Sequence, residues 1–267
     1  MKHISSRDNP LYKRMLRLAG GKRDAGMDVG DAVQRVLLEG AHLCQAWLDY
    51  AGPPELALFD AEKLAAQEEL KDLARALDPS LCLSCDSRLA KGLSQVEHGQ
   101  GVYFVVPVPA PQLPARIDRN CLWLDRIQDP GNVGTLLRTA AAAGMDQAYL
   151  SQGCAAAWSP KVLRSAQGAH FVMAIHEQVD LMALRERLTV PLVATALENA
   201  RSLYEAPLPK DCAWVLGNEG RGVAADLLSA ADRRVFIPQA ENVESLNVAI
   251  AAGVCLFEQR RQHGLPS

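Results

Sequence analysis

The sequence lacks any apolar run long enough to cross a membrane, and its first residues, MKHISSRDNP, lack the apolar core of a signal peptide. We therefore expect a cytoplasmic protein with no membrane partner. The sequence also lacks both GxGxxG and GxxxxGK[ST]. These absences argue against a nicotinamide-dependent oxidoreductase and against a P-loop site.

Disulfide and metal signals are also weak. The seven cysteines are an odd number spread along a chain without an export signal, which favours reduced thiols. Cys82 and Cys85 form a lone CxxC with no second pair and no nearby His, a pattern that favours two small, partly buried side chains over a zinc or redox site. HEQVD at 176–180 has Asp180 where a zinc-protease helix needs its second His. We expect no metal site.

Net charge is −3, which by itself does not suggest nucleic acid, but its distribution is uneven. Residues 1–23 contain seven Lys or Arg and one acid, Asp8. A basic face of this kind fits RNA phosphates, and a merely solvated helix face is the alternative.

The sequence predicts a helix inside this basic segment. Asn9 and Pro10 read as an N-cap and a first helical residue. The next apolar residues recur at helical spacing, at Leu11, Met15 and Leu18. Three basic residues fall off that stripe and are our candidate RNA contacts: Lys13, Arg14 and Arg17.

The 267 residues suffice for two modest domains. Four prolines between 107 and 117 indicate a stiff extended linker. We therefore predict an RNA-binding domain over 1–106, a linker over 107–117 and a second domain over 118–267. In the first domain we expect strands over 55–60 and 101–106 and a helix over 61–77.

Beyond the linker, short apolar runs alternate with helical stretches, which indicates an α/β domain with a buried parallel sheet. The predicted strands are 121–125, 147–150, 172–176, 191–196, 212–217 and 234–238. Ligands of such sheets bind outside the carboxyl ends of the strands. Three loops follow such ends: DRIQDPGNVGTLLRTA, GNEGRGV and the loop within IPQAENVESLNVAIAAGVCLFE.

These three segments, in this order, resemble the motifs of the SpoU (TrmH-like) RNA ribose 2′-O-methyltransferases of the SPOUT superfamily, and SPKVLRSAQGAHF resembles the family's segment between the first two. The resemblance covers about 118–262. The segment before the linker is similar to the ribosomal-protein-like substrate domain of many members. The resemblance implies a trefoil knot in the parallel-sheet domain, S-adenosyl-L-methionine as cofactor, and a homodimer formed by the C-terminal domain.

The resemblance also implies the site residues. The catalytic set is Arg138, Asn132, Glu219, Ser245 and Asn247, and the cofactor-binding set is Thr195, Gly217, Ile237 and Leu246. A guanidinium is essentially always protonated, so we interpret Arg138 as an orienting donor and leave the proton acceptor open. Strand-end backbone groups would read the adenine edge, and Ile237 and Leu246 would sandwich its face.

The helix expected from Leu246 to Phe257 is apolar on every side, so we predict that it is buried, partly by a second subunit. One departure from the family pattern is Glu241, which stands where Gly is common.

The resemblance favours 23S ribosomal RNA as substrate, because family members that act on tRNA often lack the N-terminal domain. Methylation of tRNA and a non-catalytic RNA-binding protein of the same fold remain alternatives, the second opposed by the complete catalytic set.

Overall fold

The structure is a computed structural model, and it describes residues 1–22, 33–240 and 245–264. The chain forms two compact units. Residues 1–109 and 158–171 make up the N-terminal unit, and residues 110–157 and 172–267 make up the C-terminal unit. Arg23 and Glu241, which the sequence singled out, lie outside the described residues.

The N-terminal unit is built on a five-stranded sheet in the order β1-β4-β3-β5-β2. β1, β4 and β3 run parallel, and β5 runs antiparallel to both β3 and β2. The strands are Lys2–Ile4 (β1), Arg35–Glu39 (β2), Leu56–Asp60 (β3), Cys82–Cys85 (β4) and Val102–Pro107 (β5). The sequence predicted β3 and β5, whereas it did not predict the short strands β1 and β4.

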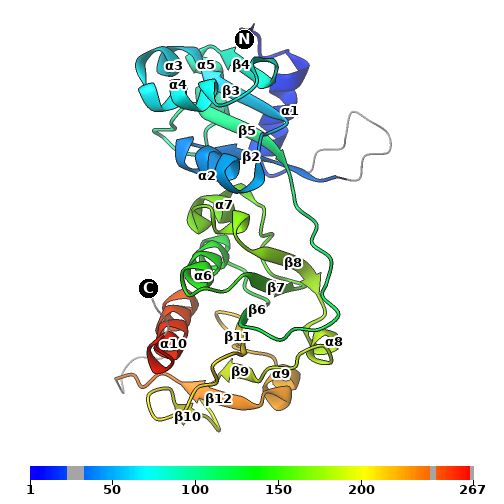
Figure 1. The fold of residues 1–267 in the computed structure, drawn as a ribbon, viewed down its shortest axis with the longest axis vertical. Coiled ribbons are helices and arrows are strands. Elements are labelled where there is room, and N and C mark those ends of the chain that lie inside the picture. Colours follow the sequence, from blue (N-terminus) through cyan, green and yellow to red (C-terminus); the bar gives the residue numbers. More distant parts are fainter. Residues whose placement is uncertain (23–32, 241–244, 265–267) are drawn as a thin grey trace. The chain divides into compact units, whose positions relative to one another are not determined.

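Helices cover this sheet, and Figure 1 shows them around it. They are Pro10–Ala19 (α1), Ala41–Ala51 (α2), Ala61–Ala66 (α3), Glu68–Arg75 (α4), Ser87–Leu93 (α5) and Pro160–Ala166 (α7), with 3₁₀ turns at Pro79–Leu81 and Ala169–Phe171. The predicted start of α1 is confirmed, because the Asn9 side chain accepts hydrogen bonds from the backbone of Leu11 and Tyr12. Met15 and Leu18 pack with α5 in the core.

One predicted helix is divided. The residues expected to form a helix over 61–77 form α3 and α4, because Gln67 takes an extended conformation with φ −111° and ψ 122°. Asp60 caps the first of the two helices through the backbone of Glu62 and Lys63. The helical composition of the segment was read correctly, but its interruption was missed.

The C-terminal unit contains a seven-stranded sheet in the order β10-β12-β9-β11-β6-β7-β8, and all its neighbouring strands are parallel. The strands are Cys121–Asp125 (β6), Gln147–Ser151 (β7), Ala174–Val179 (β8), Leu192–Thr195 (β9), Arg201–Ser202 (β10), Ala213–Gly217 (β11) and Arg233–Phe236 (β12). The prediction of a buried parallel sheet is confirmed, and only the two-residue β10 was not expected.

Helices lie on both faces of this sheet (Figure 1). Pro130–Ala142 (α6) and Val248–Gln262 (α10) pack together on one face, and Leu181–Arg185 (α8) and Ala225–Ala230 (α9) pack on the other. The buried Gln259 holds α10 to the sheet, since its Oε1 accepts from the indole N–H of Trp214 at 2.7 Å. Its Nε2 donates to Oδ1 of Asn120 at 2.9 Å, so both ends of the amide are paired.

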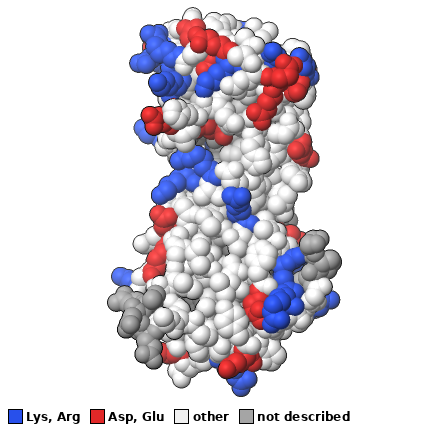
Figure 2. Space-filling view, turned by 90° about the vertical axis from the view of Figure 1, so that its left-hand side faces the viewer, with Lys and Arg blue, Asp and Glu red and all other residues white. Residues whose placement is uncertain are grey.

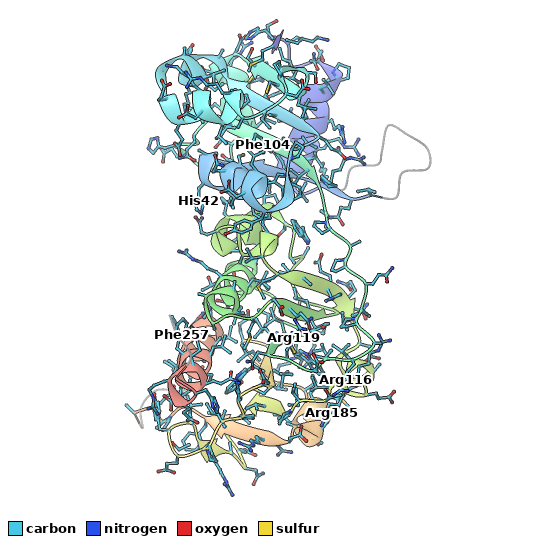
Figure 3. All side chains as sticks on the ribbon, in the orientation of Figure 1. His42, Phe104, Arg116, Arg119, Arg185 and Phe257 are labelled. Atoms are coloured by element: carbon cyan, nitrogen blue, oxygen red, sulfur yellow. The ribbon has the colours of Figure 1, made fainter. Side chains whose placement is uncertain are left out.

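Within the single chain this last helix is buried on one face only, so the prediction that a second subunit covers the rest stays a prediction. Ile250 and Phe257 are 57% and 48% exposed. Figure 3 labels Phe257 on the outer side of α10, away from the sheet. These two residues are seven positions apart, so they share one face of the helix. The opposite face packs on the sheet and on α6, and the buried residues of the helix are Ala249, Ala252, Cys255, Leu256, Glu258 and Gln259.

Candidate functional site

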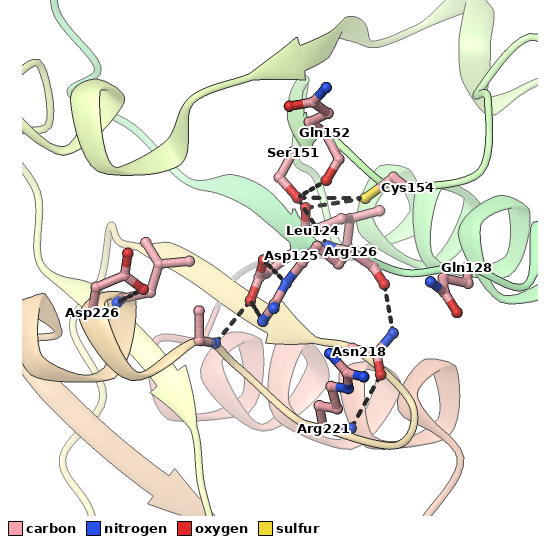
Figure 4. A network of polar contacts seen from close by, with 12 residues as sticks. Leu124, Asp125, Arg126, Gln128, Ser151, Gln152, Cys154, Asn218, Arg221 and Asp226 are labelled. Carbon is pink, nitrogen blue, oxygen red and sulfur yellow. Dashed lines mark hydrogen bonds and ion pairs between the residues drawn. The ribbon is translucent and has the colours of Figure 1, made fainter.

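A buried carboxylate joins two of the three predicted loops where β6 ends. Asp125 is 4% exposed. Arg126 donates two hydrogen bonds of 2.9 Å to its carboxylate, from Nε to Oδ1 and from a terminal nitrogen to Oδ2. The backbone N–H of Ala224, in the loop after β11, donates to Oδ2 at 2.8 Å. Figure 4 shows these contacts. The carboxylate therefore ties the β11 loop to the end of β6.

Asn218 makes a second connection between the same loops (Figure 4). Its Nδ2 donates to the carbonyl of Arg126 at 2.8 Å, and its Oδ1 accepts from the backbone of Gly220 and Arg221 at 3.0 and 3.1 Å. The sequence reasoning missed both Asp125 and Asn218. Their signal was present, because each is a polar residue at or just after the end of a buried strand.

Three predicted site residues form a continuous chain of hydrogen bonds. Asn132 Nδ2 donates to a Glu219 carboxylate oxygen at 3.0 Å, and Asn132 Oδ1 accepts from Asn247 Nδ2 at 2.9 Å. Glu219 also accepts from the backbone N–H groups of Gln128 and Asp129, both at 3.2 Å. The structure thus brings together one residue from each of the three loops.

Fixed groups at both ends determine how these two amides are oriented. Glu219 offers only acceptors, so Asn132 must turn its NH₂ group toward it. At the other end, Asn247 Oδ1 caps α10 by accepting from the backbone of Ala249 and Ile250 at 2.9 and 3.3 Å. Asn247 therefore turns its own NH₂ group toward Asn132. Each amide thus donates in the same direction, from Asn247 to Asn132 and from Asn132 to Glu219.

The pKa of Glu219 lies below its usual value. Glu219 is exposed overall, yet the partial desolvation of its carboxylate is the largest single effect and raises the pKa; hydrogen bonds from Asn132 and from backbone N–H groups together outweigh it and lower the pKa. Glu219 is thus held as a carboxylate whose acceptor positions are engaged. This is the environment of a positioning group rather than of a proton acceptor.

The remaining two catalytic candidates are accessible. Arg138 is on the exposed face of α6, six residues after Asn132. Its guanidinium makes no hydrogen bond or ion pair with any described residue. Ser245 is exposed and precedes α10. Both side chains are available to a ligand, and neither is bonded to the chain formed by Glu219, Asn132 and Asn247.

A pocket of about 680 Å³ opens at the carboxyl ends of β9, β11 and β12. This volume is in the range of pockets that hold small cofactors, roughly 300–1,000 Å³. All four predicted cofactor residues line it, as do three of the catalytic set: Thr195, Gly217, Ile237, Leu246, Glu219, Ser245 and Asn247. Asn132 and Arg138 do not line it. The pocket combines apolar walls with strand-end backbone groups, which suits a flat base joined to a polar tail.

Gly217 is required by the path of the loop. A Cβ at this position would overlap the backbone of Gly222 and Val223. The strand end and the returning loop therefore pass too close for any side chain.

Two of the three basic candidates on α1 are already paired within the N-terminal unit. Lys13 bonds Asp8 at 2.8 Å, and Arg14 lies 3.8 Å from Glu55. Arg17 is exposed, and its guanidinium has no partner in the described part of the chain. Figure 2 shows Lys and Arg lying beside Asp and Glu at the top of the view.

The described residues give little support for a disulfide, a metal site or a membrane span. All seven cysteines are free, and Cys82 and Cys85 are buried in β4. Residues 1–22, 33–240 and 245–264 contain no group of three His, Cys, Asp or Glu side chains that could hold a metal ion. Within the same ranges, no helix has both the length and the apolar character needed to cross a membrane.

Comparison with known proteins identifies the family. Residues 119–257, about half of the chain, match the SpoU rRNA Methylase family. The protein belongs to this family. An uncharacterized tRNA/rRNA methyltransferase of Synechocystis is 35% identical, over 97% of this chain and 93% of that protein. The 23S rRNA (guanosine(2553)-2′-O)-methyltransferase RlmP of Bacillus subtilis is 32% identical, over 97% of this chain and all of that protein.

A solved structure agrees with this membership. The AdoMet-bound rRNA methyltransferase of Sinorhizobium meliloti superimposes with a TM-score of 0.83 at 25% identity, over 100% of this chain and 99% of that one. The predictions of family, knotted α/β SPOUT fold, RNA 2′-O-methyltransferase activity and S-adenosylmethionine as cofactor are confirmed.

Proposed function

We propose that the protein methylates a ribose 2′-hydroxyl of 23S ribosomal RNA. The observation that carries the proposal is the hydrogen-bonded chain Glu219–Asn132–Asn247, two members of which line the cofactor-sized pocket. The names of the relatives support the substrate, since the Bacillus subtilis protein is a 23S rRNA methyltransferase. S-adenosylmethionine supplies a methyl group on a sulfonium, which is already a strong electrophile.

The protein's task is then to place the ribose hydroxyl, and alignment of this kind can contribute roughly 7–11 kcal/mol. We assign that task to Arg138 as an orienting fork, and to Ser245 and Asn247 as groups that position the ribose and its phosphate. The lowered pKa and the engaged oxygens of Glu219 support a role in holding Asn132, not in removing the proton.

We assign the pocket to the cofactor, with Thr195, Gly217, Ile237 and Leu246 as its contacts. Ile237 and Leu246 are partly buried apolar side chains that line the pocket and can cover the two faces of the adenine. Because Gly217 has no side chain, the loop after β11 can pass close to the end of the strand.

We propose that 1–106 bind the substrate RNA, that 107–117 link the domains and that 118–267 catalyse methylation. The family match over residues 119–257 supports the catalytic limits. Lys13, Arg14 and Arg17 are the proposed phosphate contacts, and Arg17 is the one whose guanidinium needs no rearrangement to reach RNA.

We also propose a homodimer and a cytoplasmic location. The exposed face of α10, with Ile250 and Phe257, supports the dimer because burying apolar surface between subunits is favourable. Sedimentation of the full chain at micromolar concentration should give twice the monomer mass, and a Phe257→Asp variant should sediment as a monomer. A monomeric wild type would contradict the proposed dimer but not the proposed activity.

The substrate is tested by methylation in vitro. Purified protein with radiolabelled S-adenosylmethionine should label 23S rRNA transcripts and leave tRNA unlabelled, and Arg138→Ala should label neither. Mapping of 2′-O-methyl positions in RNA from cells lacking the gene should show the loss of a site in the large-subunit RNA. Labelling of tRNA alone would replace the rRNA assignment with the tRNA alternative suggested by the Synechocystis relative's name.

A further inference from the structure

Arg126, the first residue after β6, has a backbone conformation that residues with side chains rarely adopt. Its φ is 56°, in the left-handed region, where the Cβ of an L-residue lies too close to a neighbouring carbonyl oxygen. Such a conformation persists only where the surrounding structure fixes it, and it occurs often at functional sites. The hydrogen bonds of Arg126 therefore indicate what holds this conformation and what depends on it.

The side chain and both adjoining peptide groups of Arg126 are hydrogen-bonded (Figure 4). The guanidinium donates to both oxygens of the buried Asp125 at 2.9 Å. The backbone N–H donates to Ser151 Oγ at 2.9 Å, and the carbonyl accepts from Asn218 Nδ2 at 2.8 Å. A change to negative φ would turn these two peptide groups relative to each other and separate at least one from its partner. The left-handed conformation is thus fixed by contacts with the ends of β6 and β7 and with the loop after β11.

This conformation bears on Glu219 from two sides. On one side, the N–H groups of Gln128 and Asp129, in the same loop as Arg126, donate to the carboxylate at 3.2 Å. On the other side, Asn218 bonds the Arg126 carbonyl and directly precedes Glu219 in the chain. The turn at Arg126 therefore determines both where the two donors lie and where their acceptor lies.

We propose that Arg126 is a positioning residue for methyl transfer. Its left-handed conformation, held by Asp125, sets the place of Glu219, and Glu219 in turn orients Asn132. The proposal rests on the proposed function, in which Asn132 belongs to the catalytic set. Arg126 does not line the cofactor pocket, and its guanidinium is engaged by Asp125. It therefore acts through the conformation of its backbone and not through contact with the ribose or the cofactor.

Two substitutions in the full chain separate this conformation from the side chain. Arg126→Gly and Arg126→Ala both remove the guanidinium, and both leave Asp125 with the same contact to the Ala224 N–H. Glycine adopts the left-handed conformation readily, whereas alanine resists it. Single-turnover methylation of 23S rRNA transcripts at saturating RNA and cofactor should therefore be about tenfold slower in Arg126→Ala than in Arg126→Gly. The two variants should bind RNA equally well.

Gln178 provides a matched control for the effect of strain on stability. It is exposed, lies in β8 with a φ of 57° and does not line the pocket. Gln178→Ala should melt at a lower temperature than Gln178→Gly, but the two should methylate RNA at the same rate. Amide exchange without RNA gives a readout that does not depend on activity. The N–H groups of Gln128 and Asp129 should exchange faster in Arg126→Ala than in Arg126→Gly.

Equal methylation rates in Arg126→Ala and Arg126→Gly would overturn the proposal, whether both match the wild type or both are slow. A lower melting temperature of the alanine variant with an equal rate would show a purely structural role. If Arg126→Ala fails to fold, Arg126→Asn replaces it, because asparagine tolerates the left-handed conformation better than alanine and less well than glycine. It should be about threefold slower than the glycine variant, and an equal rate would again overturn the proposal.

The two readouts distinguish this proposal from the proposed function. Wild type that methylates no 23S rRNA would contradict the proposed function. Equal amide exchange at Gln128 and Asp129 in the glycine and alanine variants would contradict only the role of Arg126.

Discussion

Replacing Glu219 by Gln tests whether the carboxylate aligns the catalytic amides. In the wild type, one oxygen accepts from Asn132 Nδ2 at 3.0 Å and from the Asp129 N–H at 3.2 Å, and the other accepts from the Gln128 N–H at 3.2 Å. The variant has a single oxygen. If that oxygen keeps its two donors, the new NH₂ group faces the N–H of Gln128, and two donors then oppose each other.

The expected cost follows from that geometry. One charge-assisted hydrogen bond is lost and two are weakened, which would cost about 3 kcal/mol in a fully buried site. Glu219 is exposed, so water can replace part of the loss and we expect about 1–2 kcal/mol. If the whole effect falls on transition-state alignment, kcat/KM for RNA decreases roughly five- to thirtyfold. The affinity for S-adenosylhomocysteine should change by less than about threefold, because Glu219 is not assigned to a cofactor contact.

Single-turnover methylation at saturating RNA and cofactor measures this effect separately from binding. Glu205→Gln is the matched control, since Glu205 is exposed and does not line the pocket. An unchanged rate in Glu219→Gln would refute the reasoning that the carboxylate holds Asn132 in place. A rate as low as that of Arg138→Ala would refute it in the other direction, because it would give Glu219 a direct part in the chemistry.

The pH dependence gives a second measure. The folded pKa of Glu219 is lower than its usual 4.5, so its contribution is fully present above that value and is lost as pH falls through the folded pKa. Between pH 6 and pH 9 the wild type and Glu219→Gln should therefore show parallel rate profiles. A step in this range that is present in the wild type and absent in the variant would mean that Glu219 takes the proton.

Three further outcomes are expected. Gly217→Ala should weaken cofactor binding at least about tenfold and lower thermal stability, because its Cβ overlaps backbone and overpacking costs roughly 1–3 kcal/mol. Calorimetry and melting should show no such loss in Gly253→Ala, because the atom nearest to the added Cβ is 3.8 Å away and this residue does not line the pocket. Arg138→Lys should recover little of the single-turnover rate lost in Arg138→Ala, because lysine has the charge without the planar fork; substantial recovery would show that charge suffices. Arg17→Ala should reduce by about one unit the slope of log RNA affinity against log salt concentration. Lys13→Ala should reduce it less, because Lys13 is already paired with Asp8. An unchanged slope in Arg17→Ala would mean that α1 is only a solvated face.

Local sequence patterns predicted the secondary structure correctly where the interaction that decides it lies nearby in the chain. The cap at Asn9 and the strands 121–125 and 213–217 depend on neighbouring residues and on continuous apolar character, and the structure has them as expected. The strands β1 and β4 were missed because a three- or four-residue strand has no measurable alternation and depends on pairing with distant residues, as between Lys2 and Leu83 or between Ala57 and Cys82. Gln67 interrupts a helical composition for reasons that no local signal shows.

The sequence by itself determined the family and the parallel α/β fold and named the candidate site residues, because three long motifs carry them in order. The tertiary structure alone decided how those residues meet. The hydrogen bond between Asn132 and Asn247 joins positions 115 residues apart, and the buried Asp125 ties together loops separated by 99 residues. It also decided which face of α10 the chain itself buries, since burial depends on what packs against a helix and not on its composition. Hydrogen-bond direction and burial depend on which residues are neighbours in space, and a sequence pattern does not show those neighbours.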